Sequence, residues 1–484
     1  MKLCNLSLFI FLLLTITVSV FAKGNPREPQ CEIAIIGGGA SGLYTAFRLG
    51  PEYGSRVCVF EKEAELGGRI KDVSKEPGGP VFGVGALRVI ESQRVVIDLA
   101  QELGITLEFA DNREQIISTR GYLAEDSQTL NELAYPVLPD DVSEGELYDE
   151  LLFGPSRPTA VDYPDFRSYA RDVIGVEGYQ FLADMSRFRG EFTAPVDARS
   201  FLDWLDEEET LFGPAGYPIG GMSQYIVRMA EEARSYGVQI FTSEPVISVN
   251  RSGKGNQFNK KYKVITKKRF IRPKFVVIAT PVNALKHIKG NVIRDIRRQQ
   301  EFKDILAIPV VTVTQWWNEP WWLTAPEREL VNRLWSTEAA LNFIEIPVWP
   351  YAEVQNVTRS VYDDSPDTVS FWKTAANRST QSVDDEIRRG LEYLYPNARI
   401  PNPEKTFVQI WPGAWFWLRG GSDFRNIDIA RWAIEPLKGE NVALVGDSYF
   451  PQRATWSDAA YKSAINMLNE RFGLRLQDQT VELD

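Results

Sequence analysis

The segment Cys31–Ile70 constrains the fold more than any other part of the chain, because it combines two strand patterns with a helix and a glycine turn between them. The run Glu32–Ile36 predicts a buried strand, and Arg56–Phe60 predicts a second one. The residues between the turn and about Leu49 have the pattern of a helix. A strand, a helix and a strand in this order form the βαβ unit that begins a parallel sheet.

The glycine turn predicts a phosphate site. Gly37 allows the tight turn, Gly39 lets the backbone approach a pyrophosphate, and Gly42 lets the helix pack closely on the strand. The phosphates then lie on free N–H groups at the helix N-terminus, where Ser41 is a further candidate contact. Glu61 follows Gly42 by roughly 20 residues, the place where an acid accepts the ribose hydroxyls of an adenosine. Because the turn lies between a strand and a helix, dinucleotide binding is favoured over a purely structural turn.

Composition excludes several classes of protein. The 484-residue chain is long enough for two substantial lobes, and its net charge of −11 without an evident basic stripe argues against nucleic acid as a partner. The single histidine, His287, follows a buried strand pattern, where a structural or surface role is favoured, so a Ser-His-Asp triad is nearly excluded. There is no CxxC and no Cys/His cluster, and we therefore expect no metal site.

The first residues have the pattern of a secretory signal peptide. Lys2 precedes the apolar run Leu6–Phe21, and Ala22 offers a cleavage site, so we assign residues 1–22 to the signal and expect a protein that is secreted or lies in the secretory-pathway lumen. A retained anchor helix is the alternative; since the run is short and no other segment could span a bilayer, no stable membrane anchor is expected. Candidate glycosylation sites are Asn250, Asn356 and Asn377.

Two cysteines remain after the signal, Cys31 and Cys58, in neighbouring strands of one predicted parallel sheet. A disulfide between them is one interpretation, but buried free thiols are favoured.

Helices and strands alternate along the rest of the chain. Helices are predicted over Asp98–Leu103, over much of an acidic stretch from Asp140 to Asp206 that suits a lid, and over Gln224–Tyr236.

Most later strand patterns are short. They lie at Gln239–Phe241 and Tyr262–Thr266, around a basic hairpin-like loop, and at Phe275–Ala279, whose apolar run indicates a buried parallel strand. A substrate-side strand is predicted from Val310–Trp317, a short buried strand from Asn441–Asp447, and a closing helix from Trp456–Phe472.

A set of motifs occurs in a fixed order over nearly the whole mature chain: Gly37–Gly42, Glu61, Gly67-Gly68-Arg69, Gly220-Gly221-Met222, Val246, Val442–Asp447 and Thr455–Ala460. In this combination the chain resembles the flavin-containing amine oxidase family, which includes monoamine, polyamine and L-amino-acid oxidases. Within that family the secreted L-amino-acid oxidases of molluscs are most similar, through Gly190–Thr193, Pro320–Trp322 and Trp415–Gly421.

The resemblance implies FAD rather than NAD, and an α/β fold with a discontinuous Rossmann-type FAD-binding domain, a mixed-sheet substrate domain and a helical lid. The implied FAD-binding parts are residues 31–105, 216–290 and 436–475, the lid region is 106–215, and the substrate domain is 291–435. The oligomeric state stays open, with a homo-oligomer as one option.

The same resemblance assigns cofactor contacts. Gly68 and Arg69 are placed at the pyrophosphate, with Asp447 at a ribityl hydroxyl. Further cofactor contacts are Val246, Gly446 and Trp456. Part of the family attaches its flavin to a cysteine near the end of the chain. This chain has no cysteine after Cys58, so non-covalent FAD is expected.

Three residues are implied on the substrate side. Arg88 matches the arginine with which amino-acid oxidases hold a substrate carboxylate, for which a guanidinium is a suitable fork; a pair with a structural acid or with the flavin is the alternative. Trp415 and Trp456 match the positions that flank the substrate in front of the flavin, with packing in a tryptophan-rich core as the alternative.

Thr312 departs from the family pattern. Alignment on Trp316–Trp322 places it where most members have a lysine that holds a water at flavin N5 and is linked to the reaction of reduced flavin with oxygen. Threonine is uncharged and too short for that role, and nothing in the sequence shows that another lysine, such as Lys373, reaches the flavin. Oxygen reactivity is therefore an open question.

Three functions remain. The first is a secreted FAD-dependent oxidoreductase that oxidises an L-amino acid or related amine, with oxygen as acceptor. The second is a polyunsaturated fatty acid isomerase that moves a double bond by internal hydride transfer with no net redox change, which suits Thr312. In both, Arg88 holds the carboxylate of a small-molecule substrate. The third is a FAD-binding fold without catalysis.

Overall fold

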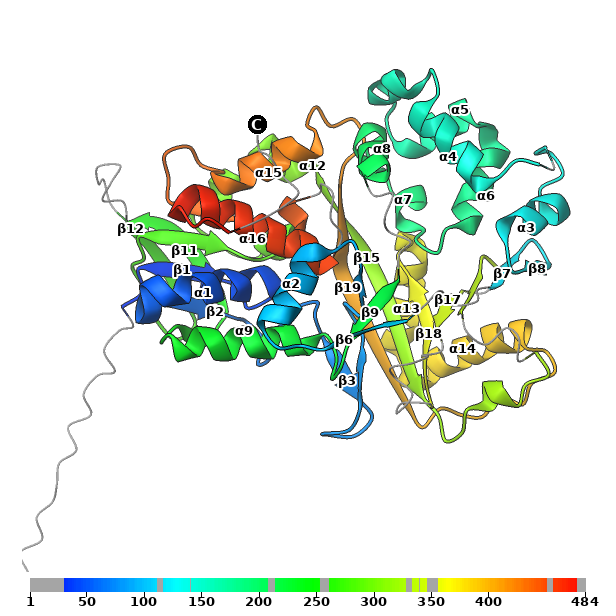
Figure 1. Cartoon of the computed structure of the whole chain (residues 1–484), viewed down its shortest axis with the longest axis horizontal. Coiled ribbons are helices and arrows are strands. Elements are labelled where there is room, and N and C mark those ends of the chain that lie inside the picture. The colour runs from blue at the N-terminus through cyan, green and yellow to red at the C-terminus, as the bar shows by residue number, and fades with distance from the viewer. Residues whose placement is uncertain are drawn as a thin grey trace, which may run out of the picture.

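The computed structural model describes residues 30–110, 116–139, 141–207, 214–252, 261–327, 333–338, 340–345, 356–450 and 456–476. The predicted signal segment, residues 1–22, lies outside them. This part of the chain is built around a parallel sheet at one end of the molecule and a larger mixed sheet at the other (Figure 1). The mixed α/β architecture agrees with the sequence-based prediction.

The parallel sheet has the strand order β10-β2-β1-β14-β20. Its strands are β1 (Ile33–Ile36), β2 (Val57–Phe60), β10 (Gln239–Phe241), β14 (Phe275–Ile278) and β20 (Val442–Leu444). All neighbouring pairs run parallel. The strands β1, β2 and β14 are continuous apolar runs because both faces of the sheet are buried. The buried parallel strand predicted near residue 275 is confirmed.

Both faces of this sheet are covered. On one face, Ile33 and Ile35 share a core with α1 (Ala40–Tyr53), α2 (Arg94–Glu102), α9 (Ser223–Ser235) and α16 (Trp456–Phe472). On the other face, Ala34 and Ile36 share a core with β11 (Val246–Ser252), β12 (Lys261–Thr266), β13 (Phe270–Ile271), α10 (Val282–Leu285) and α11 (Asn291–Ile296). The alternation along β1 follows from the two-residue period of a strand.

The mixed sheet has the order β19-β15-β18-β17-β16-β7-β8, and its β16–β7 pair is parallel while the others are antiparallel. Its strands are β7 (Ile116–Thr119), β8 (Tyr122–Ala124), β15 (Ile305–Trp316), β16 (Arg333–Ser336), β17 (Asn342–Glu345), β18 (Val357–Asp363) and β19 (Lys405–Leu418). The helices α13 (Pro366–Arg378) and α14 (Thr380–Leu394) pack against this sheet. The long strands β15 and β19 run through the middle of the molecule (Figure 1).

A group of helices lies beside the mixed sheet (Figure 1). It comprises α3 (Ser127–Ala134), α4 (Glu144–Phe153), α5 (Phe166–Val173), α6 (Gly175–Met185), α7 (Gly190–Thr193) and α8 (Ala198–Glu207). The helical prediction for the acidic stretch is thereby confirmed. Smaller elements are β3 (Asp72–Ser74), β4 (Val81–Gly83), β5 (Val89–Ile90), β6 (Leu107–Ala110), β9 (Ala215–Pro218), α12 (Gln300–Asp304) and α15 (Asn426–Ile434). Among the described helices, none is long and apolar enough to cross a membrane.

Some boundaries differ from prediction. Helix α1 continues past Leu49 and through Pro51 to Tyr53, since a proline in the last turn removes only one donor and Gly54, at φ +49°, ends the helix. Two other elements begin earlier than predicted, α2 at Arg94 and β15 at Ile305.

The predicted hairpin is also different. β10 joins the parallel sheet, whereas β12 pairs with β11, so the two predicted strands do not flank one loop. Strand β11 was missed because Asn250 and Arg251 interrupt its apolar pattern.

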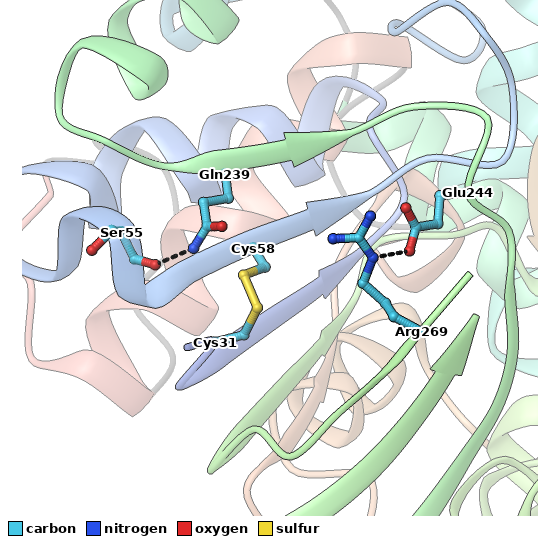
Figure 2. The surroundings of a disulfide bond; sticks show 6 residues. All are labelled: Cys31, Ser55, Cys58, Gln239, Glu244 and Arg269. Carbon is cyan, nitrogen blue, oxygen red and sulfur yellow. Dashed lines mark hydrogen bonds and ion pairs between the residues drawn. A yellow bond between two sulfur atoms is a disulfide. The ribbon is translucent and has the colours of Figure 1, made fainter. Parts of the chain in front are cut away.

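Cys31 and Cys58 form a disulfide, so the expectation of free thiols is wrong (Figure 2). The parallel register sets Ile33 opposite Val57, and the two cysteine Cα atoms are 5.6 Å apart, within the usual range for a bridge. A sequence pattern shows that two strands are neighbours but not their register, and the register decides whether the thiols meet. A disulfide is typical of oxidising compartments.

Candidate active site

A cavity of about 1800 Å³ lies where the carboxyl ends of the parallel strands meet the mixed sheet. Gly37, Glu61 and Gly446 line it at strand ends of the parallel sheet, and Thr312 and Trp415 line it from β15 and β19. Open α/β sheets bind ligands at this end. Because single small-molecule pockets have roughly 300–1000 Å³, the cavity has room for a dinucleotide and a second molecule.

The glycine turn has the geometry that its sequence predicts. Gly37 has φ +113°, and a Cβ there would lie 2.4 Å from the carbonyl oxygen of Ala279. A Cβ on Gly42 would lie 2.1 Å from the carbonyl oxygen of Gly37, so helix α1 could not approach the turn with any larger residue. Gly39, the residue before α1, provides no side-chain cap, and Ala40 and Ser41 line the cavity. The first N–H groups of α1 are thus available for a pyrophosphate.

Glu61 lies at the end of β2 and is only 7% exposed. Its two carboxylate oxygens accept hydrogen bonds from the backbone N–H groups of Gly38, at 2.7 Å, and Glu63, at 2.9 Å. These bonds fix the carboxylate in the cavity wall, and its remaining lone pairs can accept ribose hydroxyls.

Gly67, Gly68 and Arg69 line the cavity beside the glycine turn. The N–H of Gly67 donates to the carbonyl of Gly38 at 2.8 Å, and both glycines have positive φ, +118° and +60°. The guanidinium of Arg69 forms a two-pronged ion pair with Asp447 and donates to the carbonyl of Ala414 at 3.0 Å. The two residues predicted to contact different parts of FAD therefore lie side by side in the cavity wall.

Three further predicted contacts also line the cavity. Val246 begins β11, Gly446 has φ +138° just after β20, and the Ser41 hydroxyl lies 3.5 Å from the carbonyl oxygen of Val445. The uncapped helix N-terminus, the glycine-lined approach and the oriented Glu61 carboxylate together fit an adenine dinucleotide.

At the mixed-sheet side, Arg88 lies in the cavity wall with a side chain that is 16% exposed. Its guanidinium is 3.9 Å from Glu345 on β17, whereas Arg359 on β18 lies 3.2 Å from the other oxygen of Glu345. Arg88 therefore has a structural acid near it, as the alternative interpretation expected. That acid lies closer to a second arginine.

Trp415 and Tyr362 form an aromatic wall of the cavity. The ring of Trp415 lies 5.4 Å from the ring of Phe188 at 69°, an edge-to-face contact. Burial, together with the charge of Asp364, raises the pKa of Tyr362, so this hydroxyl stays protonated. Trp456 is the first residue of α16, but its side chain lies outside the part of the chain that the structure describes.

Thr312 lies in the same wall and is 3% exposed. Its hydroxyl donates to the carbonyl of Val84 at 3.1 Å, a carbonyl that also accepts from the indole of Trp411 at 3.0 Å. Lys373, the other lysine considered, lies on α13 and is not among the residues that line the cavity.

Three buried carboxyl groups lie behind the aromatic wall, and the sequence did not single them out. Asp364 accepts hydrogen bonds from the N–H groups of Arg189, at 2.7 Å, and Gly190, at 2.9 Å, which holds α7 against the end of β18. Burial raises the pKa of Asp363 to about 6, and burial with the charge of Asp363 raises that of Asp364 to about 7. Burial and the charge of Asp364 raise the pKa of Glu191 as well.

Glu345, Arg359 and Tyr362 were also missed. Arg359 is a buried charged residue within strand β18, and a charge inside a strand pattern is a signal that could have been used. In the described residues, no group of three His, Cys, Asp or Glu side chains is arranged to hold a metal ion.

The fold and the cavity define an α/β nucleotide-binding enzyme whose cofactor site opens toward a second, mixed-sheet wall. The chain belongs to the flavin-containing amine oxidoreductase family, which matches residues 40–466, and it is thus a flavoprotein oxidoreductase whose family implies FAD.

Relatives support this assignment. The chain is 21% identical to aplysianin-A of Aplysia kurodai over 92% of this chain and 91% of that protein. It is 22% identical to achacin of Lissachatina fulica over 98% of this chain and 100% of that protein. An L-amino-acid oxidase of Echis ocellatus is 30% identical over 26% of each chain.

Proposed function

We propose that this enzyme oxidises an L-amino acid, or a related amine that carries a carboxylate, with FAD as hydride acceptor and oxygen as final electron acceptor. The chemistry that FAD supplies when bound is hydride acceptance. The expected products are a keto acid, ammonia and hydrogen peroxide. The family, and the name L-amino-acid oxidase of one relative, support this class of substrate.

The position of Arg88 is the observation that carries the proposal. Its guanidinium lines the cavity. The carboxylate near it, Glu345, lies closer to Arg359 than to Arg88, so Arg359 offsets the negative charge of Glu345. A site with two guanidinium groups and one carboxylate keeps a positive charge for a substrate carboxylate. The fork of Arg88 can then fix the substrate orientation.

The aromatic wall supplies the second requirement. Trp415, which packs edge to face against Phe188, presents a large apolar face to the cavity. Such a face excludes water from the reacting carbon and limits how a substrate can lie. We include Trp456 in this wall by its position in the sequence.

Thr312 favours a second candidate, a fatty acid double-bond isomerase on the same fold. A buried, uncharged side chain whose hydroxyl already donates to Val84 offers no amine that could hold a water. An isomerase that returns its hydride to the substrate has no need to react with oxygen. Arg88 would then hold the carboxylate of the fatty acid.

A substrate panel separates the two candidates. Purified enzyme with FAD is incubated with amino acids and, separately, with polyunsaturated fatty acids. Peroxide and oxygen uptake with an amino acid support the oxidase. New conjugated-diene or triene absorbance without oxygen uptake would reject it and support the isomerase, and no reaction with either set would reject both.

Two variants test the assigned roles. Arg88→Ala is expected to raise KM for carboxylate substrates by about tenfold or more while FAD content stays unchanged, and Arg88→Lys should recover part of the loss because charge without the fork remains. A loss of FAD in Arg88→Ala would make Arg88 a cofactor residue. Thr312→Lys is expected to raise peroxide production, and an unchanged rate would show that this position does not govern oxygen reactivity.

We also propose that FAD is held without a covalent bond and that the protein is exported. The chain has three cysteines, and the two after the predicted signal are joined to each other, so neither has a thiol for a flavin. The disulfide and the signal pattern before Ala22 favour the secretory route. Amino-terminal sequencing of the mature protein tests cleavage after residue 22.

A further inference from the structure

A wide surface groove of about 1010 Å³ lies next to β11, over the segment that joins α10 and α11. Five cationic side chains line this groove together with His287, and each of the six is exposed; the cations are Lys286, Lys289, Arg294, Arg297 and Arg298. No aspartate or glutamate is among the described residues that line it. We call this set the basic groove.

The basic groove contrasts with the rest of the molecule. The chain has 65 acidic and 54 lysine or arginine residues, with a net charge of −11. Asp295, the acid within this stretch of sequence, is shared between Arg251, at 2.7 Å, and Arg294, at 3.1 Å. Like charges gathered within a Debye length, about 8 Å at physiological salt, repel one another, and an anionic ligand would relieve that repulsion.

The backbone that carries these cations is fixed. Lys289 donates its N–H to the carbonyl of Ile247 at 2.8 Å and accepts from Val249 at 2.9 Å, so the segment is joined to β11. Gly290 has φ +110°, and a Cβ there would lie 2.0 Å from the carbonyl oxygen of Val249. A side-chain bond from Arg297 to the carbonyl of Lys286, at 3.2 Å, ties the two ends of the groove together. The backbone positions from which the charged side chains project are therefore fixed.

We propose that the basic groove binds a sulfated or uronic-acid polysaccharide. No Phe, Tyr or Trp is among the described lining residues, so the groove offers no platform on which nucleic acid bases could stack. Its apolar lining residue, Ile288, is 9% exposed and offers no anchor for a membrane. An open groove with exposed cations suits a linear chain of repeated anionic groups, and the disulfide favours an extracellular setting, where such chains occur.

The sequence did not reveal this surface. The basic residues are separated by Ile288, Val292 and Ile293, which face the core beneath the parallel sheet, so no continuous basic stripe is visible. Folding removes these apolar residues from the surface and brings the cations together.

Binding of fluorescein-labelled heparin to the mature holoenzyme tests the proposal, with titrations at about 0.15 M salt and at higher salt. The test variant is Lys289→Glu with Arg298→Glu. It leaves intact Lys286, His287 and Ile288, which also line the cofactor cavity. The control, Lys373→Glu with Arg378→Glu, makes the same change of charge on exposed residues of α13. We expect salt-sensitive binding that weakens by about tenfold or more in the test variant and not in the control.

Other outcomes would overturn the proposal. They are no heparin binding by the wild type, equal losses in both variants, or tighter binding to duplex DNA or to phosphatidylserine vesicles than to heparin. Loss of FAD from the test variant would show that the groove serves the cofactor instead. Asn250 also lines the groove, so a glycan found on it by peptide mapping would fill the site and equally reject the proposal.

Discussion

The charge that Arg88 can offer to a substrate depends on Arg359, because both arginines lie near Glu345. Arg359 lies 3.2 Å from Glu345, and Arg88 lies 3.9 Å from it, so removal of Arg359 makes Arg88 the nearer arginine to this carboxylate. We predict that Arg359→Leu weakens binding of carboxylate substrates by roughly tenfold, because Arg88 is then neutralised within the protein. KM for the substrate, or its Kd from the flavin absorbance, measures this.

The double variant Arg359→Leu with Glu345→Gln is the matched control. Removal of both charges should return affinity toward the wild-type value, since Arg88 is again without a competing carboxylate. Thermal melts of both variants measure the loss of stability. Arg359→Leu removes one partner of the buried Arg359–Glu345 pair, for which a loss of about 3–5 kcal/mol in the free energy of unfolding is expected. Unchanged affinity in Arg359→Leu would assign the arginine a purely structural role.

Substitution of Gly42 tests whether the glycine turn tolerates a side chain. A Cβ there would lie 2.1 Å from the carbonyl oxygen of Gly37, so Gly42→Ala must push helix α1 away from β1. We predict loss of most bound FAD and a stability loss of about 1–3 kcal/mol, the usual cost of overpacking. The ratio of flavin to protein absorbance and a denaturant titration give the two results.

Gly145 provides the control for that substitution. It lies in α4, and a Cβ there would meet nothing closer than 3.8 Å. Gly145→Ala should raise stability by about 0.5–1 kcal/mol through helix propensity and leave FAD content unchanged. Equal FAD contents in the two glycine variants would contradict the role of Gly42.

Residues whose role is local could be predicted from the sequence, and residues that act through distant partners could not. Gly37, Gly42 and Glu61 belong to one short unit, and their spacing is set by the phosphate geometry. Glu345 and Arg359 meet Arg88 only after three separate parts of the chain fold together.

Between elements, the disulfide joins the segment before β1 to β2. It closes a loop with a sequence separation of 27 residues. A bridge of this span lowers the entropy of the unfolded chain and so stabilises the folded state by about 3–4 kcal/mol. Cys31→Ala with Cys58→Ala should lower the free energy of unfolding by an amount of this size. Reductant should lower the stability of the wild type and leave the variant unchanged; equal sensitivity to reductant would mean that the bridge does not form.

The contact between α7 and β18 makes stability depend on pH in an unusual direction. The pKa of Asp364 is raised from an ordinary value of 3.8 to about 7, so the folded state keeps a proton that the unfolded state releases. We predict that the contribution of Asp364 to the free energy of unfolding falls as pH rises from about 4 to about 7, where one pKa unit corresponds to about 1.4 kcal/mol, and levels off above that range.

Asp364→Asn tests this dependence. The asparagine oxygen can still accept from the N–H groups of Arg189 and Gly190, while the titrating group is gone. The variant should show a shallower loss of stability between pH 4 and 7 and become more stable than the wild type at pH 8, as measured by urea unfolding. Parallel pH profiles for the two proteins would reject the assignment.

Element patterns were predictable where burial dictates them. The apolar runs of β1, β2 and β14 identified parallel strands, because both faces of that sheet are covered. Strand β11, exposed on part of one face and interrupted by polar residues, gave no such pattern. Register, and with it the pairing of Cys31 and Cys58, depends on how whole strands align.

For the whole molecule, the position of the cavity links cofactor binding to stability. One wall comes from the parallel sheet, through Gly37 and Glu61, and the other from the mixed sheet, through Thr312 and Trp415. A ligand that spans both walls must hold the two sheets together. We propose that FAD spans both walls, whereas ADP contains only the half for which the glycine turn and Glu61 are predicted to form the site.

We therefore predict that FAD, but not ADP, stabilises the apoprotein as one unit. Dialysis against concentrated bromide removes a non-covalent flavin, and FAD added back at 100 times its Kd should raise the free energy of unfolding by about 2.7 kcal/mol. Differential scanning calorimetry should show one transition that moves upward with FAD. With ADP, the unfolding transition should broaden. Only the part of it that reports the parallel-sheet side should move to higher temperature, because the mixed-sheet wall has no ligand. Flavin that stays on the denatured protein would contradict non-covalent binding, and equal gains with both ligands would mean that the mixed sheet takes no part in holding FAD.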